Sequence, residues 1–376
     1  MMHTKMAGLY IHVPFCLSKC RYCSFYSITS ARLLPEFVKA VAQEIAFYKN
    51  IFSSFDTLYF GGGTPSLLTI RQAQTILDAA RNHFDITRQA EITMEINPGD
   101  VSLEYFQALR KLGINRLNIG VQSFDDPLLK FLGRRHTAKQ AIESIETART
   151  AGFTNLGFDL IYGVHGQNLK SWRQTLKKAL SFSPEHLSCY QLSLDRKTFL
   201  YRQYKKEGLD LSSEKEALDF FITTSKVLTE AGYNHYEVSN FARTHHYKSR
   251  HNRKYWDHKP YLGLGPAAHS FSDNRRWWNK ADVKTYLKVI GSGRKPVITS
   301  EMLSTKQLAL EALFLGMRTS DGVNLESFKK LYGLDLLTGK KSIIEALIDN
   351  KLVVLKNDRL CPTLAGMAVA DSLSLI

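Results

Sequence analysis

Residues 8–23 read GLYIHVPFCLSKCRYC and set the pattern that the first 240 residues follow. The β-branched and aromatic residues of 8–13 predict a strand, and a loop with Cys16, Cys20 and Cys23 follows it directly. The same order, a short apolar run and then a stretch of helical period, recurs along the chain. These runs predict strands at 8–13, 56–61, 91–96, 116–121, 156–162 and 186–192, and helices near 34–50, 69–83, 102–112, 137–151, 168–182 and 213–232.

Repeated units of one strand and one helix require a parallel sheet with right-handed crossovers. Six units with glycine-rich strand ends favour an α/β fold built as a partial or closed (β/α)6 barrel over a doubly wound sheet. Cys16, the GGGTP turn at 61–65, Glu95, Gln122 and Asp159 all lie in or just after such strands. Because barrel chemistry gathers at the carboxyl ends of the strands, we expect these residues to meet at one rim.

After about residue 300 the pattern changes to short helices around a two-strand wing at KNDR, residues 356–359. This order resembles a winged-helix module. Residues 301–376 hold nine Lys or Arg and nine Asp or Glu, and this zero net charge argues against DNA binding. We therefore expect a barrel core at 1–240, a basic, aromatic-rich segment at 241–300 and a small winged-helix-like domain at 301–376.

The five cysteines do not form a disulfide framework, because the number is odd and three of them lie within eight residues. Cys189 and Cys361 stand alone and are interpreted as small buried hydrophobes. The chain has no apolar run near the roughly 18 residues that span a bilayer, and residues 1–15 lack the features of a signal peptide. We expect a folded, cytoplasmic protein.

Three crowded thiols in a reducing compartment indicate a metal site. Zinc would require a fourth ligand, and the nearby His12 lies on the first strand, four residues before Cys16. A cubane iron–sulfur cluster is bound by thiolates, and three of them leave its fourth iron open to an exogenous ligand. The spacing therefore favours a 4Fe-4S cluster.

CLSKCRYC, residues 16–23, resembles the CxxxCxΦC signature of the radical S-adenosylmethionine (SAM) superfamily, with Tyr22 as the aromatic residue. The resemblance implies that the open iron binds the amino and carboxylate groups of SAM. YFGGGTPSLL, residues 59–68, is similar to the glycine motif of that superfamily, and glycines allow close approach of the backbone to a ligand.

Further motifs resemble the coproporphyrinogen III dehydrogenase-like group, which contains HemN-type dehydrogenases and HemW-type haem chaperones. They include EINPGD (95–100), LGINRLNIGVQSF (112–124), LGRRHT (132–137), DLIYG (159–163), HYEVSNFA (235–242) and RHNRKYWDHKPYLGLGPAAHSF (250–271). The resemblance implies SAM contacts at Tyr10, Gly62, Gly63, Thr64, Glu95, Gln122, Arg134 and Asp159. Carboxylates suit the ammonium or ribose hydroxyls of SAM, and Arg134 suits its carboxylate.

Two features separate the subfamilies. The dehydrogenases have a further cysteine two places after the third, where this chain has Phe25, and an extension before the first strand. HNRKYW, residues 251–256, resembles the HNxxYW motif of the HemW type, which implies a haem site with His251 as its candidate ligand. Tyr255 and Trp256 could stack on a porphyrin, and Arg250, Arg253 and Lys254 could pair with its propionates. A packed aromatic turn with surface lysines is the alternative.

The net charge of +15 is concentrated in one segment. Residues 241–300 hold 13 Lys or Arg and 3 Asp or Glu, an excess of ten. This stretch is either a solvated basic face or a site for an acidic, flat ligand, because aromatic residues lie among its cations. Two residues depart from the family pattern: His165, which could supply a second imidazole or reshape its loop, and Ala267, where glycine is usual.

The function expected from these residues is that of a haem chaperone that binds a 4Fe-4S cluster, SAM and haem and transfers haem to an acceptor protein. The alternative is an oxygen-independent coproporphyrinogen III dehydrogenase, which would make the protein an enzyme. A basic, nucleic-acid-modifying radical enzyme is a third class that leaves the HNRKYW motif unexplained, so no nucleic acid is expected. The pattern allows transient association with a membrane. It identifies neither the acceptor nor the oligomeric state.

Overall fold

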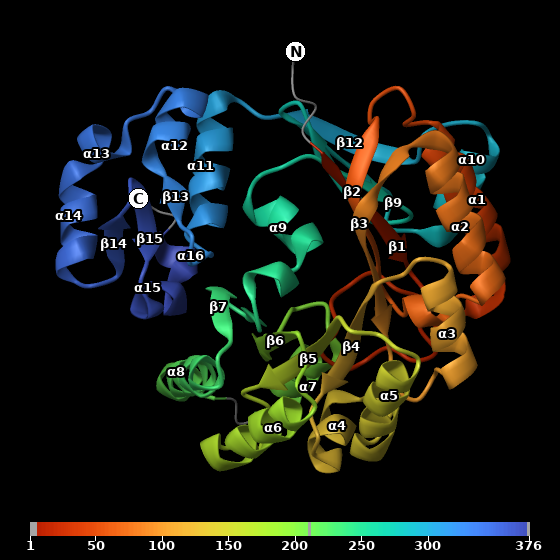
Figure 1. Cartoon of the computed structure of the whole chain (residues 1–376), viewed down its shortest axis with the longest axis horizontal. Coiled ribbons are helices and arrows are strands. Elements are labelled where there is room, and N and C mark those ends of the chain that lie inside the picture. Colours follow the sequence, from red (N-terminus) through yellow and green to blue (C-terminus); the bar gives the residue numbers. More distant parts are fainter. Residues whose placement is uncertain (1–5, 210–211, 374–376) are drawn as a thin grey trace.

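In a computed structural model, which describes residues 6–209 and 212–373, six parallel strands form the centre of the fold (Figure 1). They stand side by side in the order in which they occur along the chain. The strands are β1 (Ala7–Val13), β2 (Ser54–Gly62), β3 (Asp85–Ile96), β4 (Arg116–Gln122), β5 (Leu156–Tyr162) and β6 (His186–Gln191). Sequential order is typical of a singly wound barrel, so the predicted (β/α)6 fold is confirmed.

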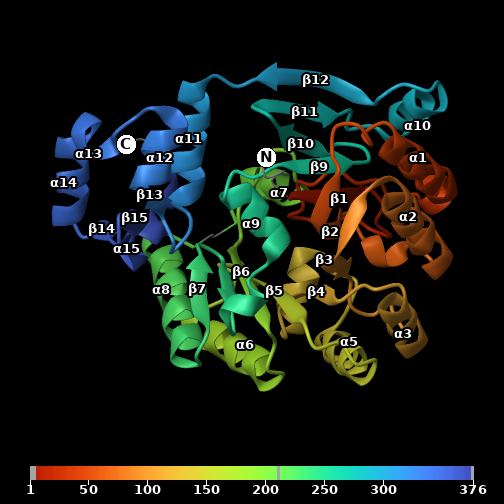
Figure 2. The ribbon, with the colours of Figure 1, turned by 45° about the horizontal axis from the view of Figure 1, so that its top comes forward.

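Helices follow the strands and, apart from α7, cover one face of the sheet (Figures 1 and 2). They are α1 (Leu34–Ala46), α2 (Ile70–His83), α3 (Leu103–Lys111), α4 (Asp126–Leu132), α5 (Ala138–Thr150), α6 (Leu169–Ser181), α7 (Phe199–Glu207) and α8 (Glu214–Glu230). Capping boxes at Thr69, Thr137 and Ser213 begin α2, α5 and α8, because each cap side chain accepts from the third helical residue. Leu9, Ile11 and Val13 of β1 are fully buried in the core.

The barrel is open, because other strands continue the sheet at both edges. On one side β6 pairs antiparallel with β8 (Asn240–Ala242), and β8 pairs with β7 (Asn234–Glu237). On the other side β9 (Tyr261–Leu264) pairs parallel with β1. Three antiparallel strands follow: β10 (His269–Ser272), β11 (Arg275–Asn279) and β12 (Val297–Met302). The strands of the basic segment thus belong to the same twelve-stranded sheet.

Two helices of the basic segment take different positions. α9 (Arg250–Trp256) packs against β1 and β2, and both ribbon views show it inside the curve of the sheet (Figures 1 and 2). α10 (Val283–Gly291) packs on the outside against α1. The HNRKYW motif therefore lies within the barrel and not on an outer surface.

The C-terminal part has its own hydrophobic core, which includes Leu313, Met317 and Val353. Its helices are α11 (Thr305–Gly316), α12 (Leu325–Tyr332), α13 (Leu336–Gly339), α14 (Lys341–Asp349), α15 (Leu364–Ala368) and α16 (Ala370–Leu373). The predicted wing is β14 (Val353–Lys356) and β15 (Arg359–Pro362), and β13 (Val323–Asn324) adds a third strand. The division of the chain into three parts, at residues 1–240, 241–300 and 301–376, stays a prediction.

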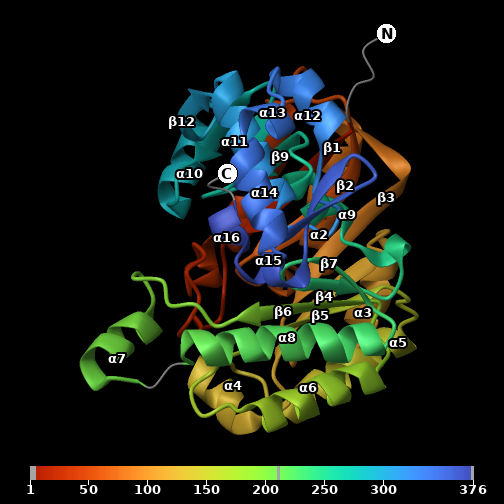
Figure 3. The same ribbon diagram turned by 90° about the vertical axis from the view of Figure 1, so that its left-hand side faces the viewer.

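No helix in the described ranges is both long and apolar enough to cross a membrane. α7 projects from the body of the protein (Figure 3). Its Leu200 N–H donates to Arg21 O of the cysteine loop at 2.9 Å, so the projecting segment contacts that loop at its base.

Candidate functional site

The inner face of the barrel is polar. Side chains alternate along each strand, so apolar residues such as Leu9 and Ile11 face the helices while Tyr10 and His12 face inward. One cavity of about 550 Å³ occupies this interior. Its lining includes every candidate site residue of the sequence: Tyr10, Cys16, Cys20, Cys23, Gly62, Gly63, Thr64, Glu95, Gln122, Arg134, Asp159 and His251. The expected convergence on one rim is confirmed.

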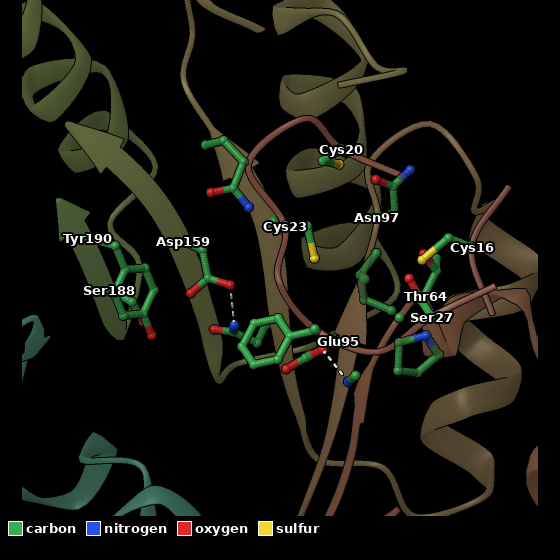
Figure 4. Close-up of a pocket in the computed structure, with 18 of the residues that line it drawn as sticks. Cys16, Cys20, Cys23, Ser27, Thr64, Glu95, Asn97, Asp159, Ser188 and Tyr190 are labelled. Carbon is green, nitrogen blue, oxygen red and sulfur yellow. Dashed lines mark hydrogen bonds between the residues drawn. The ribbon is translucent and has the colours of Figure 1, made fainter. Parts of the chain in front are cut away.

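The cysteine loop is held over this cavity by backbone hydrogen bonds. Cys16 N–H donates to Ile28 O at 3.0 Å, and Arg21 N–H donates to Leu132 O at 3.1 Å. All three thiols are free and half-buried, and Figure 4 shows them on the same side of the cavity. Burial raises the pKa of Cys23, so a thiolate there needs a nearby positive charge.

Arg134 supplies a positive charge beside the thiols. Its Nη1 donates to Cys20 Sγ at 3.3 Å, and its Nη2 donates to Asn97 Oδ1 at 2.7 Å and to Gly120 O at 2.9 Å. No three metal-ligating side chains of the described residues are arranged to hold a single ion. Three separate thiols beside a buried guanidinium fit the ligand set of an anionic iron–sulfur cluster.

The glycine turn is required by close approach within the protein itself. A Cβ on Gly63 would lie 2.7 Å from Phe15 O, and one on Gly62 would lie 2.6 Å from His12 Nδ1. Gly62 also has φ +110°, and its N–H donates to Glu95 Oε2 at 3.2 Å. These glycines allow β1, β2 and the cysteine loop to pack together. Their expected second role, to make room for a ligand, stays a prediction.

Two half-buried carboxylates, Glu95 and Asp159, lie in the cavity with the thiols (Figure 4). Glu95 accepts from Tyr59 Oη at 2.9 Å, and burial together with the charge of Asp159 raises its pKa to about 7. Asp159 accepts from Asn118 Nδ2 at 2.7 Å, while its Oδ1 is buried without a hydrogen-bond partner. Burial raises the pKa of Asp159 too. This arrangement can accept hydrogen bonds from a ligand that carries an ammonium or hydroxyl groups.

Gln122 enters the cavity at an irregular position of β4. Its φ is +64°, and the β4–β5 register shifts between Ile119 and Gln122. Such a bulge re-aims a side chain at the end of a strand.

His251 is placed in the cavity wall and is 1% exposed. Its Nδ1 pairs with Thr57 Oγ1 at 2.9 Å and its Nε2 with Tyr255 Oη at 3.0 Å. Burial lowers its pKa to about 3, so the ring is neutral. Since both ring nitrogens have partners, His251 can bind an iron only if the Tyr255 hydroxyl moves away and the iron is inside the cavity.

Arg250, Arg253 and Lys254 also form ion pairs within the protein, which corrects the expectation that these cations are available to the propionates of haem. Arg250 and Lys254 both pair with Asp56, at 3.3 and 2.5 Å, and Arg253 pairs with Asp321 at 3.3 Å. These contacts connect α9 to β2 and to the C-terminal part. Only the Lys254 side chain is buried, at 7% exposure, where an unpaired charge would be costly; the Arg250 and Arg253 side chains are 42% and 33% exposed.

Most of the unpaired charge of the basic segment lies around α10 instead, and Arg243 is a further exposed cation without an ion pair among the described residues. Six exposed cations around α10 form no ion pair with the described residues: Arg275, Lys280, Lys284, Lys288, Arg294 and Lys295. The excess of positive charge therefore does not coincide with the HNRKYW motif. His165 is also exposed and packs near Phe131, outside the cavity lining.

Sequence reasoning missed several lining residues, among them Arg116, Asn118, His186, Ser188 and Tyr190. They occupy alternate positions of β4 and β6, so the signal was the alternation of polar and apolar residues within each strand.

Comparisons with known proteins agree with this geometry. The radical SAM superfamily matches residues 10–179, and the HemN C-terminal domain matches residues 303–369. The chain is 35% identical to the heme chaperone HemW of Lactococcus lactis over 361 residues, covering 95% of this chain and 93% of that protein. It is 33% identical to the heme chaperone HemW of Bacillus subtilis, covering 93% of each chain.

The fold also matches a solved structure. Coproporphyrinogen III oxidase (HemN) from Escherichia coli superposes with a TM-score of 0.86 at 23% identity, covering 99% of this chain and 89% of that one. This likeness supports the open barrel and its C-terminal addition. The identity over nearly the whole length to two HemW proteins gives the family: the chain belongs to the HemW family of the radical SAM superfamily.

Proposed function

We propose that this protein is a haem chaperone that binds a 4Fe-4S cluster, SAM and haem and transfers haem to an acceptor protein. The observation that carries the proposal is the identity of 32–36% to proteins named heme chaperone HemW, which extends over most of the chain. The cavity supports the cofactor part, because the cysteine, glycine and strand-end motifs all line it.

Within this proposal the chain's own residues have separate tasks. Cys16, Cys20 and Cys23 hold the cluster, and Arg134 stabilises the thiolate of Cys20. Glu95 and Asp159 accept hydrogen bonds from the ammonium or ribose hydroxyls of SAM. A bound cluster would supply an iron with an open position for the amino and carboxylate groups of SAM.

Haem is proposed to enter the same cavity. His251 is the candidate axial ligand, and binding there exchanges its hydrogen bond to Tyr255 for a bond to iron. A cavity of about 550 Å³ is in the range that holds one drug-sized ligand, so SAM and haem should compete for it.

Phe25 supports a carrier in preference to a dehydrogenase. Phe25 lines the cavity and is 67% exposed. It occupies the position at which the dehydrogenases have a further cysteine. An exposed phenylalanine supplies no thiol for electron transfer, and it offers an apolar surface to a flat ligand.

The test is a titration of the cluster-loaded protein with haem under anaerobic conditions, followed by gel filtration. We expect about one haem per chain, and release of that haem when SAM is added in excess. A cluster-loaded, folded protein that leaves all haem in the small-molecule fraction would refute the chaperone function.

A further inference from the structure

The end of the cavity farthest from the thiols carries two buried donors. Arg116 is the first residue of β4 and His186 the first residue of β6, whereas the cysteine loop follows the last residue of β1. Because these strands are parallel, the two sets lie at opposite ends of one cavity. Arg116 and His186 are each 1% exposed. Neither residue is among the expected SAM or cluster contacts, although Arg116 lies within the motif LGINRLNIGVQSF, residues 112–124.

Arg116 is a buried cation whose electrostatic interaction with the cavity carboxylate Asp159 is not a direct ion pair. Its Nη1 donates to Ser249 Oγ at 2.9 Å, and its Nε is buried without a hydrogen-bond partner. Among residues 6–209 and 212–373, no carboxylate forms an ion pair with it. A buried charge is costly unless it is paired, so this guanidinium has capacity for an anionic partner.

His186 points a second donor toward the same space. Tyr236 Oη lies 2.7 Å from His186 Nε2 and also accepts from Ser249 N–H at 3.2 Å. We assign the tyrosine hydrogen to Nε2, which gives that hydrogen an acceptor, and the ring proton of neutral His186 is then on Nδ1. Burial, and then the charge of Arg116, lower the pKa of His186, which keeps the ring neutral. Its Nδ1 is buried without a partner.

Gly157 lies beside both donors. It is in β5, between β4 and β6, and pairs in register with Asn118 and His186. A Cβ at this position would lie 2.6 Å from Asn118 Oδ1, 3.5 Å from His186 Nδ1 and 3.6 Å from Arg116 Nη2. The absence of a side chain at residue 157 therefore lets the Asn118 amide and both donors lie close to one another.

We propose that Arg116 and His186 form a binding site for one carboxylate of the ligand that occupies the cavity. A guanidinium and an imidazole N–H that face one space match the two oxygens of a carboxylate. Resting on the proposed function, this carboxylate is a haem propionate. The carboxylate of SAM is the other source of the same chemistry, and the experiment distinguishes the two.

Arg116 also anchors α9 through Ser249, and this structural role needs its own control. Arg116→Gln removes the charge, and His186→Gln removes the Nδ1 donor while retaining an amide that can bond Tyr236. Ser249→Ala removes the contact from Arg116 to α9 and the N-cap hydrogen bond that Ser249 Oγ accepts from Asn252 N–H, but it leaves both donors that face the cavity. The variants are compared as cluster-loaded, full-length proteins whose far-UV circular dichroism matches the parent.

The probes are haem, haem dimethyl ester and SAM, each titrated against parent and variants. Arg116→Gln should weaken haem binding about 10- to 100-fold, the loss expected for a charge-assisted hydrogen bond. The ester, which lacks carboxylates, should bind parent and Arg116→Gln alike. Ser249→Ala should bind haem within about threefold of the parent. If Arg116→Gln does not fold, His186→Gln is judged by the same criterion.

Each outcome decides the proposal. A loss of SAM affinity in place of haem affinity assigns the carboxylate to SAM and retains the site. Equal losses for haem and its ester, or unchanged affinities for all three probes, overturn the site. A parent that binds no haem refutes the proposed function alone, and the SAM titration then decides the site: unchanged SAM affinity in Arg116→Gln overturns it as well.

Discussion

Gly62→Ala should damage the SAM end of the cavity through one steric conflict. The new methyl group would lie 2.6 Å from His12 Nδ1 and 2.7 Å from its Cε1. His12 cannot easily turn away, because its Nε2 is 2.8 Å from Tyr26 O, its Nδ1 is 3.1 Å from Tyr10 Oη, and it is 5% exposed. Overpacking of this kind costs about 1–3 kcal/mol. The positive φ of Gly62 adds about 1–2 kcal/mol for a residue with a Cβ.

Gly232→Ala is the matched control, since Gly232 has φ +85° but no neighbouring atom that a Cβ would meet within 4 Å. The free energy of unfolding, from urea titrations followed by circular dichroism, should fall by about 2–5 kcal/mol in Gly62→Ala and by about 1–2 kcal/mol in Gly232→Ala. SAM affinity, from equilibrium dialysis, should fall tenfold or more only in Gly62→Ala, because His12 would push against Tyr10. Equal stability and equal SAM affinity in the two variants would refute this reasoning.

Four further expectations can be measured. Cys16→Ala, Cys20→Ala and Cys23→Ala should each abolish the absorption near about 400 nm of the reconstituted cluster, whereas Cys189→Ala, a change in the buried core, should retain it. His251→Ala should alter the haem spectrum more than His83→Ala does; a folded, cluster-loaded His251→Ala protein with the parent's spectrum and affinity would exclude His251 as the ligand. Burial raises the pKa of Glu44 to about 7, above its unfolded value, so the contribution of Glu44 to stability is greatest below its unfolded pKa and is lost as the pH rises to about 7; urea titrations from pH 5 to 8 should show a shallower decline in Glu44→Gln. Ala267 has φ +63°, so Ala267→Gly should increase the free energy of unfolding by about 1 kcal/mol, and a decrease would contradict the strain.

Strand and helix positions could be predicted closely because their signals are local. Five of the six barrel strands begin and end within two residues of the predicted ranges. The exception is β3, which begins at Asp85 and not at 91, because Asp85 and Ile86 pair with Ser54 and Phe55 of the neighbouring strand. That pairing is a tertiary contact, and residues 85–90 show no apolar run from which it could be predicted.

The convergence of the candidate residues could also be predicted. Parallel strands bring their carboxyl ends together, so motifs far apart along the chain had to meet at one edge. Arg116 and His186 lie at the opposite strand ends, and only the alternation inside each strand indicates that they face inward. The unpaired state of their nitrogens depends on neighbours that no sequence pattern identifies.

The environment of the HNRKYW motif was beyond sequence reasoning. Asp56, which pairs with Arg250 and Lys254, is 194 and 198 positions away along the chain. The net charge of residues 241–300 was counted correctly, but the position of the unpaired cations was predicted wrongly. The ion pairs neutralise the cations of α9, and most of the exposed, unpaired cations lie around α10. A count of charges along the sequence does not show which carboxylates the fold places next to those cations.

The most direct test of the account is to incubate the cluster-loaded protein with SAM, an electron donor and coproporphyrinogen III, and in parallel to mix the cluster-loaded protein with haem in the absence of SAM. We expect about one haem bound per chain and no repeated conversion of coproporphyrinogen III to protoporphyrinogen IX, measured by chromatography of the extracted porphyrins. Multiple turnovers per chain would contradict the carrier function and establish a dehydrogenase.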